Sequence, residues 1–199
     1  FTFYDNDAPG DWYNYLDLFD VLKQAGYHTA WLSNQESSGF YGSIARVYAN
    51  RCDEGRFTMQ SSHTIDLSDR PDEQVLPLLD RALQTPAEKN FYVVHLMGTH
   101  EDFKRRYPVA YQHFQASDET GSKEDERQVR AEYDNAILYN DWIVNEIIRR
   151  FEDKNAMVIY ISDHAEEVYD YRSICGHGDE LSSWQREIPM VIWTSGKCR

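Results

Sequence analysis

Basic residues, cysteines and long apolar runs are all scarce in this 199-residue sequence. Only 20 lysines and arginines stand against 34 aspartates and glutamates, which gives a formal net charge of −14. This balance argues against a nucleic-acid partner, because phosphate backbones attract basic surfaces. It argues equally against a broad electrostatic contact with anionic lipid. A small anionic group can still bind where a metal ion supplies the positive charge.

The cysteines, Cys52, Cys175 and Cys198, lie far apart and show no zinc-finger spacing. They can form one disulfide and leave one thiol, so cysteine usage leaves the redox compartment open. No apolar run is as long as a membrane-spanning helix, and no signal peptide is visible. The sequence opens with Phe1 rather than Met. We therefore expect a piece of a longer parent chain, in which any membrane span or targeting segment would lie upstream.

What is present is the composition of a folded domain. Hydrophobic residues make up 41% of the chain and aromatic residues 14%, which excludes a disordered polypeptide. The length suffices for one sizeable core, so we expect a single domain over residues 1–199.

Short apolar runs alternate with helical patterns along the chain. The predicted strands are 27–33, 91–97, 157–161 and 188–194, and the predicted helices are 12–24, 43–48, 72–83 and 128–152. Such alternation predicts an α/β fold, a three-layer α/β/α arrangement with a mainly parallel sheet.

Several local expectations accompany this pattern. Asp11 is the expected cap of the first helix, and Pro77 predicts a kink or a late start in the third. Residues 51–71 are expected to be mostly irregular. Residues 115–127 hold almost no apolar side chain and predict a mobile surface loop.

The strand at 157–161 carries the strongest chemical signal, because Asp163 and His164 follow it directly. The strand itself is expected to be buried on both faces. Ligands in parallel α/β sheets bind beyond the carboxyl ends of the strands. A carboxylate and an imidazole at that place can hold one zinc-like ion. The alternative is that Asp163 caps a following helix and His164 packs locally.

Two further histidines extend the candidate site. His100 follows the predicted strand 91–97, again at a carboxyl end, whereas His95 lies inside that strand and is expected to be a hydrogen-bonded core residue. His177 stands between Gly176 and Gly178, and flanking glycines let the backbone bring an imidazole close to a ligand. The basic run 104–106 either faces a phosphate or forms a solvated loop. Topology predicts that Asp163, His164, His100 and His177 converge on one site.

Taken together, these motifs resemble the phosphoethanolamine transferases of the alkaline phosphatase/sulfatase superfamily. The resemblance covers residues 16–195 and rests on the order and spacing of several motifs. They are Asp20-Val-Leu-Lys-Gln-Ala-Gly26, Trp31-Leu-Ser-Asn-Gln35, His95-Leu-Met-Gly-Thr-His100, Arg105-Arg-Tyr-Pro108, Tyr133-Asp-Asn-Ala136, Ser162-Asp-His164, Gly176-His177-Gly178 and Glu187-Ile-Pro-Met-Val-Ile-Trp193.

The resemblance implies an alkaline-phosphatase-like fold, with Asp163 and His164 as zinc ligands. It implies that His100 and His177 hold the phosphoryl group or a second metal. In such enzymes a zinc-activated Thr attacks phosphatidylethanolamine, and the phosphoethanolamine group then passes to lipopolysaccharide, in its core or lipid A, or to another envelope glycan. Zinc would lower the pKa of the nucleophile and stabilise charge on phosphorus. The resemblance also implies an anchor in the bacterial inner membrane and a catalytic domain in the periplasm.

Two departures from the family pattern stand out. No residue here matches the nucleophilic Thr or the acidic zinc ligand that lie N-terminal to these motifs in the family. We therefore expect the C-terminal part of a catalytic domain that is inactive alone. Ala165 replaces a glycine that many members carry, and it would be strained if the position required positive φ.

Two alternatives stay open. A sulfatase or phosphodiesterase of the same superfamily would hydrolyse where a transferase transfers, and its Cys/Ser-x-Pro-x-Arg motif would also lie upstream. A non-catalytic domain would keep the fold and bind a glycan or another partner.

Overall fold

The chain folds into two compact units in the computed structural model. The first comprises residues 1–68 and 73–97, and the second comprises residues 69–72 and 98–199. The structure describes residues 14–37, 43–59, 71–84, 86–178 and 182–198. The expectation of a single domain over residues 1–199 stays a prediction.

A three-stranded parallel sheet forms the centre of the first unit, with strand order β2-β1-β3. The strands are β1 (His28–Glu36), β2 (Glu54–Met59) and β3 (Asn90–His95). Residues 29–34 of β1 are all buried, because the central strand is covered by neighbours on both edges and by helices on both faces. The strands predicted at 27–33 and 91–97 are confirmed.

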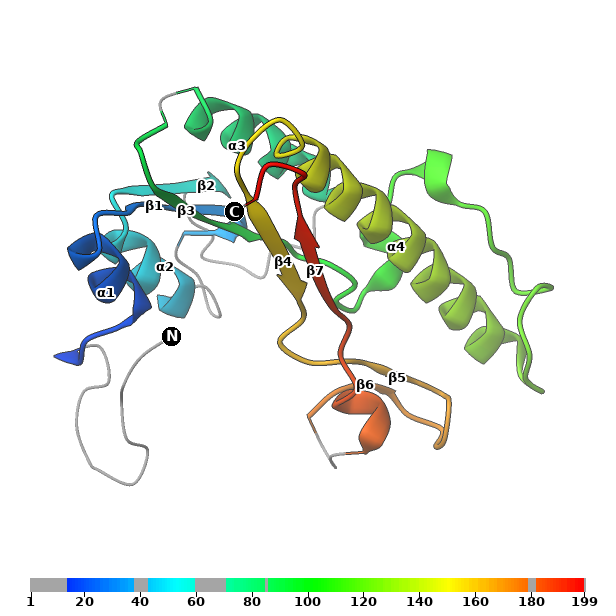
Figure 1. Ribbon diagram of the computed structural model, residues 1–199. Helices are drawn as coiled ribbons and strands as arrows, with labels where there is room; N and C mark the ends of the chain where they lie inside the picture. The colour runs from blue at the N-terminus through cyan, green and yellow to red at the C-terminus, as the bar shows by residue number, and fades with distance from the viewer. Residues whose placement is uncertain (1–13, 38–42, 60–70, 85, 179–181, 199) are drawn as a thin grey trace. The chain divides into compact units, whose positions relative to one another are not determined.

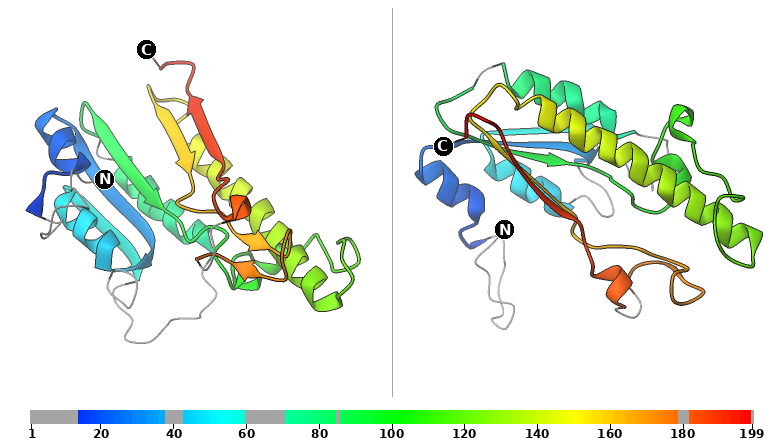
Figure 2. Two further views of the ribbon diagram at one scale, coloured as in Figure 1. Left: turned by 90° about the horizontal axis from the view of Figure 1, so that it is seen from below. Right: turned by 45° about the vertical axis from the view of Figure 1, so that its right-hand side comes forward.

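Helices lie on both faces of this sheet. Figures 1 and 2 show α1 (Leu18–Gln24) and α2 (Ser43–Arg51) on one face and α3 (Leu76–Ala82) on the other. The predicted layering of helix, sheet and helix is therefore present. Phe19 of α1, Trp31 of β1 and Tyr48 of α2 form an aromatic core with ring centroids 5.9 Å apart.

Two expectations in this unit were wrong. Residues 51–71 include β2, which the sequence did not reveal because Glu54 and Arg56 interrupt its apolar residues; charges suit a strand that pairs on one edge with β1. The first helix begins at Leu18 rather than near residue 12. Asp17 caps it in a capping box with Asp20, since each side chain accepts a bond from the other's backbone N–H. Asp11 lies outside the described residues.

The late start predicted at Pro77 is confirmed. Residues Asp72–Val75 form a 3₁₀ turn, and α3 follows with Pro77 in its first turn, where a missing N–H costs no hydrogen bond.

Helix α4 (Glu124–Arg149) is the longest element of the second unit. Beside it lie two antiparallel strand pairs, β4 (Met157–Ile161) with β7 (Met190–Thr194) and β5 (Glu167–Val168) with β6 (Cys175–Gly176). The 3₁₀ turns are η3 (Phe103–Arg105), η4 (Val109–Tyr111) and η5 (Ser183–Gln185). The strands predicted at 157–161 and 188–194 are confirmed, although the second begins at Met190 and runs antiparallel to the first.

Strand β4 differs from its expected burial on both faces. Met157, Ile159 and Ile161 are more than half exposed, whereas Tyr160 on the opposite side is half-buried and accepts a bond from Asn140 of α4. One face of β4 therefore packs towards α4. The other face is apolar and exposed.

Helix α4 begins inside the segment expected to be a loop. Glu124, Asp125 and Glu126 occupy its first turn, where negative charge favours the helix dipole. Asn135, fully buried on α4, accepts bonds from the backbone N–H groups of His113 and Phe114 at 2.7 and 2.9 Å, so it holds the chain that precedes the loop.

No helix among the described residues is both long and apolar enough to cross a membrane.

Candidate active site

The chain makes a tight turn where it leaves β4, and this turn orients Asp163 and His164. Ser162 Oγ donates to the carbonyl oxygen of His164 at 2.6 Å. The backbone N–H of His164 donates to Asp163 Oδ1 at 3.1 Å. The Asp163 side chain is 89% exposed, so its carboxylate faces solvent and is free of burial cost.

The three histidines predicted for the site lie together in the second unit. The ring centroids of His164 and His177 are 3.7 Å apart. The ring of His100 lies 5.8 Å from that of His177 and 6.5 Å from that of His164. The convergence expected from topology is thus present for these imidazoles, which come from three separate segments.

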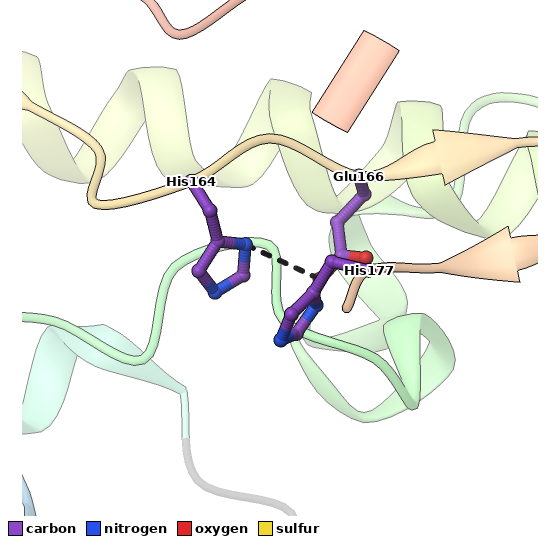
Figure 3. A group of neighbouring side chains, drawn as sticks. All are labelled: His164, Glu166 and His177. Atoms are coloured by element: carbon purple, nitrogen blue, oxygen red, sulfur yellow. Dashed lines mark hydrogen bonds and ion pairs between the residues drawn. The ribbon is translucent and has the colours of Figure 1, made fainter. Parts of the chain in front are cut away.

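Glu166 joins this group and was not predicted. Its side chain is 4% exposed, and Oε1 accepts a hydrogen bond from His177 Nδ1 at 2.9 Å. The same oxygen lies 3.9 Å from His164 Nδ1. Figure 3 shows the two rings side by side with the carboxylate next to them. One donor atom from each of His164, Glu166 and His177 lies within 4.8 Å of the others, a spacing that suits a metal ion.

Hydrogen bonds fix which nitrogen of each ring carries the proton. His164 Nδ1 lies 3.2 Å from the carbonyl oxygen of Ala165, which can only accept, so Nδ1 is the donor. His177 Nδ1 likewise donates to Glu166. The Nε2 atoms of both rings therefore keep their lone pairs for a ligand. Asp163 Oδ1 lies 3.8 Å from His164 Nε2.

The segment that carries His100 is held by Arg106. Its Nε donates to the carbonyl oxygen of His100 at 2.9 Å, and a terminal nitrogen donates to that of Glu101 at 3.0 Å. Arg105 pairs instead with Asp102 at 2.7 Å. Arg105 and Arg106 of the basic run at 104–106 thus stabilise their own loop. Arg106 bonds the backbone of this loop and is not simply a solvated side chain.

Glu167 anchors the whole segment that contains β5, β6 and η5. It is fully buried, and Arg172 donates to both carboxylate oxygens, with the closest contact at 2.8 Å. Ser182 Oγ and Gln185 Nε2 donate to Oε2 at 2.9 and 3.5 Å. The hydrogen bonds from Arg172 and Ser182 lower the pKa of Glu167 to about 2, so the carboxylate is charged at neutral pH.

Charge and burial also set the state of two neighbours. Burial, followed by the negative charges of Glu166, Glu101 and Asp170, raises the pKa of the Cys175 thiol to about 11. Cys175 is therefore a protonated thiol and no activated nucleophile. Burial and the charges of Glu166 and Asp170 raise the pKa of Tyr133.

Two remaining expectations can be decided here. His95 is half-buried and its Nδ1 lies 3.0 Å from Ser33 Oγ, which confirms a hydrogen-bonded histidine outside the cluster. Ala165 is not strained by positive φ, because Tyr169, with φ of 59°, is the non-glycine residue of the described chain that adopts it.

Sequence reasoning missed Glu166, Glu167 and Gln185. The available signal was a pair of glutamates directly before the apolar residues Val168 and Tyr169. Acidic residues that enter a buried strand need donors, and Arg172 and Ser182 are those donors. Their distance from Glu167 along the chain hid the connection.

The fold has a solved counterpart. The crystal structure of the C-terminal periplasmic domain of EcEptC from Escherichia coli, in complex with Zn, matches with a TM-score of 0.81 and 32% identity, over 92% of this chain and 53% of that one. The chain is thus an alkaline-phosphatase-like α/β domain in its fold. The sulfatase family model matches residues 2–199, and the chain belongs to the sulfatase family.

Several curated relatives are phosphoethanolamine transferases. EptC of Escherichia coli O18:K1:H7 (strain RS218 / NMEC) is 33% identical over 204 residues, which cover 98% of this chain and 35% of that protein. The Kdo(2)-lipid A phosphoethanolamine 7''-transferase of Escherichia coli K12 is 26% identical over 188 residues, which cover 91% of this chain and 32% of that protein. The chain spans about a third of the length of these relatives.

The low pKa of Glu167 predicts a specific acid sensitivity. Because its pKa is lower in the folded chain than the ordinary value of 4.5, its contribution to stability is complete above about pH 4.5 and is lost as the pH falls towards 2. Glu167→Gln should lower the free energy of unfolding at neutral pH, and the gap from wild type should shrink below about pH 4.5.

Urea unfolding at a series of pH values measures this gap. The exposed Glu187→Gln is the matched control, and its gap should stay within about 0.5 kcal/mol throughout. A Glu167→Gln gap that stays constant down to about pH 2.5 would contradict the assignment of Glu167 as a charged anchor.

Proposed function

We propose that the protein is a zinc-dependent phosphoethanolamine transferase of the bacterial envelope, with phosphatidylethanolamine as donor and lipopolysaccharide (core or lipid A) or another envelope glycan as acceptor. The observation that carries this proposal is the convergence of His100, His164 and His177 beside the buried Glu166. The sulfatase family and the transferases among its relatives support the reaction class. The relative that acts on Kdo(2)-lipid A supports the class of acceptor.

The residues of the site fit a zinc ion. Imidazole and carboxylate donors are the usual ligands of zinc in a catalytic site. Glu166 Oε2 is buried and accepts no hydrogen bond within the described part of the chain, so negative charge there lacks a partner. Gly176 lets Glu101 come near as well, since a Cβ on that glycine would lie 3.3 Å from Glu101 Oε2. A cation would relieve this concentration of acidic groups.

In this proposal Asp163 and His164 hold the zinc ion. The exposed carboxylate of Asp163 and Nε2 of His164 lie 3.8 Å apart, close enough for both to bind one ion. The bond from His164 Nδ1 to the carbonyl of Ala165 orients the ring, as partners of metal-bound histidines commonly do. When bound, zinc would stabilise negative charge on a phosphoryl group and on the nucleophile.

His100 and His177 are the proposed contacts to the phosphoryl group. His177 has its Nδ1 fixed by Glu166, and its Nε2 has no hydrogen-bond partner among the described residues. Nε2 can therefore accept a proton or, when protonated, donate to a phosphoryl oxygen. His100 is exposed and its backbone is braced by Arg106. Both roles require a nucleophile. In the family pattern this nucleophile is a Thr that lies N-terminal to the motifs matched here.

The proposed location is the periplasmic side of the inner membrane. The solved counterpart is a periplasmic domain, and an envelope acceptor would be met there. The acidic net charge of −14 is consistent with an anchor outside these residues, because the chain itself offers little attraction to anionic lipid.

Replacement of Asp163 tests the metal assignment. Asp163→Asn in the complete protein should weaken zinc binding at least about tenfold, because a neutral amide is a poorer ligand than a carboxylate. A chelator competition titration measures the affinity. Asp153→Asn, an exposed change in the same unit, should leave it unchanged. Equal affinities for the two variants would remove Asp163 from the site.

Replacement of His177 tests the reaction. His177→Ala should slow phosphoethanolamine transfer by about 100-fold or more while zinc stays bound, since a lost proton-transfer group commonly costs that much. His113→Ala, an exposed histidine of the same unit, is the control and should transfer at the wild-type rate.

The assay follows both transfer to lipopolysaccharide and release to water. Hydrolysis without transfer would favour a sulfatase or phosphodiesterase. Zinc binding with neither reaction in the complete protein would favour a non-catalytic domain.

A further inference from the structure

Gln185 connects the two segments that carry His164 and His177. It is 4% exposed and ends the 3₁₀ turn η5. Its carbonyl oxygen accepts a hydrogen bond from Ala165 N–H at 3.1 Å, directly after His164. Its side-chain Oε1 accepts one from Gly178 N–H at 3.3 Å, directly after His177. One buried residue is thus bonded to the chain immediately beyond each histidine.

The backbone around His177 needs such a bond. Gly176 and Gly178 have φ of 111° and 109°, a region open to glycine and unfavourable for other residues. Glycines on both sides leave the chain with little local preference of its own. The position of His177 is therefore set by bonds to other segments. These are the pairing of Gly176 in β6 with Glu167 in β5, the side-chain bond to Glu166, and the backbone bond from Gly178 to Gln185.

Glu167 fixes Gln185 in turn. The side-chain Nε2 of Gln185 donates to Glu167 Oε2 at 3.5 Å, so that the amide presents Oε1 to Gly178. An amide bonded at both ends has a defined orientation, which a rotating side chain would lack. The charged anchor, the amide and the histidine loop form one continuous series of hydrogen bonds.

We propose that Gln185 is a positioning residue that sets the separation of His177 from His164. The expected effect on catalysis rests on the proposed function. The expected effect on the position of His177 depends only on the bond between Gln185 and Gly178. A displacement of about 1 Å in a reacting group can cost about 100-fold in rate, so a bond next to His177 matters to catalysis without any contact to substrate.

Gln185→Met in the complete protein tests this role, because Met has a similar length and offers no hydrogen bond. Amide hydrogen exchange of Gly178 should speed up about tenfold or more once its acceptor is gone. The imidazole NMR signals of His177 should shift, while zinc affinity stays within about threefold, since the Gln185 carbonyl that bonds Ala165 remains. The kcat of transfer should fall by about 10- to 100-fold, with a smaller change in KM.

Two matched variants separate positioning from stability. Ser182→Ala removes another donor to Glu167 but no bond to Gly178, so it should destabilise the fold and leave kcat within about threefold. Gln128→Ala removes an exposed glutamine whose amide bonds Glu132, and it should change neither readout. If Ser182→Ala slows transfer as much as Gln185→Met does, stability alone explains the loss and the proposal is overturned.

A double mutant identifies the residue through which Gln185 acts. In a His177→Ala background, Gln185→Met should have no further effect on kcat, because the positioned group is absent. A full additional loss would show that Gln185 acts elsewhere and would overturn the proposal.

Gln185→Glu serves if the Met variant does not fold. It keeps an oxygen that can accept from Gly178 N–H, although it places a second carboxylate beside Glu167. The proposal requires Gly178 protection and kcat to be kept together or lost together; a change in one without the other overturns it. If wild type shows no transfer, the proposed function fails, and Gly178 exchange with the His177 signals decides the positioning role by itself.

Discussion

A carboxylate that stays charged with no exposure to water must be surrounded by hydrogen-bond donors. Glu167 meets this condition through Arg172 in the loop of the hairpin β5–β6 and through Ser182 and Gln185, which follow the hairpin. The hairpin has only two residues in each strand, too few to fix a loop by themselves. The buried charge supplies the missing constraint. Through Gln185 it extends to the segments that hold His164 and His177.

The same arrangement separates two kinds of acidic residue in a chain of net charge −14. Glu167 is neutralised within the protein, whereas Glu166 keeps one oxygen without a hydrogen-bond partner among the described side chains. Asp163 is exposed and lies beside a free imidazole nitrogen. The site therefore has uncompensated negative charge where a cation would bind, and the cation would in turn admit an anionic phosphoryl group. In the proposed function, a metal ion would therefore allow an acidic protein to bind an anionic phosphoryl group.

Sequence patterns predicted the parts of the fold in which one signal is sufficient. Continuous apolar runs identified β1, β3 and β4, and the helical stripe identified α4. Strand β2 was not predicted because charged residues interrupt its apolar pattern. The antiparallel direction of β7 relative to β4 could not be predicted from a short apolar run. The exposure of one face of β4 could not be predicted either, because an apolar sequence does not show whether another element covers that face. The start of α1 was predicted wrongly because Asp11 also fits the pattern of a capping residue. In the structure, Asp17 and Asp20 form the cap.

The candidate site shows the same division. His100, His164 and Asp163 follow strand ends, where the rule for α/β sheets expects ligands to bind. Strands β3 and β4 belong to different sheets, yet the structure brings the two histidines near His177. No comparable rule predicts the roles of Glu166, Glu167 and Gln185. Their roles depend on contacts between distant segments, such as the bond between Gln185 and Ala165, which are 20 residues apart, and no local pattern encodes them.

The most direct test of the account is anomalous X-ray diffraction at the zinc edge from crystals of the complete protein grown with zinc. The proposed zinc site predicts an anomalous peak about 2.0–2.2 Å from an Asp163 carboxylate oxygen and from His164 Nε2, with Gln185 still bonded to Gly178. A zinc peak with neither residue among its ligands, or no peak in this region, would contradict it.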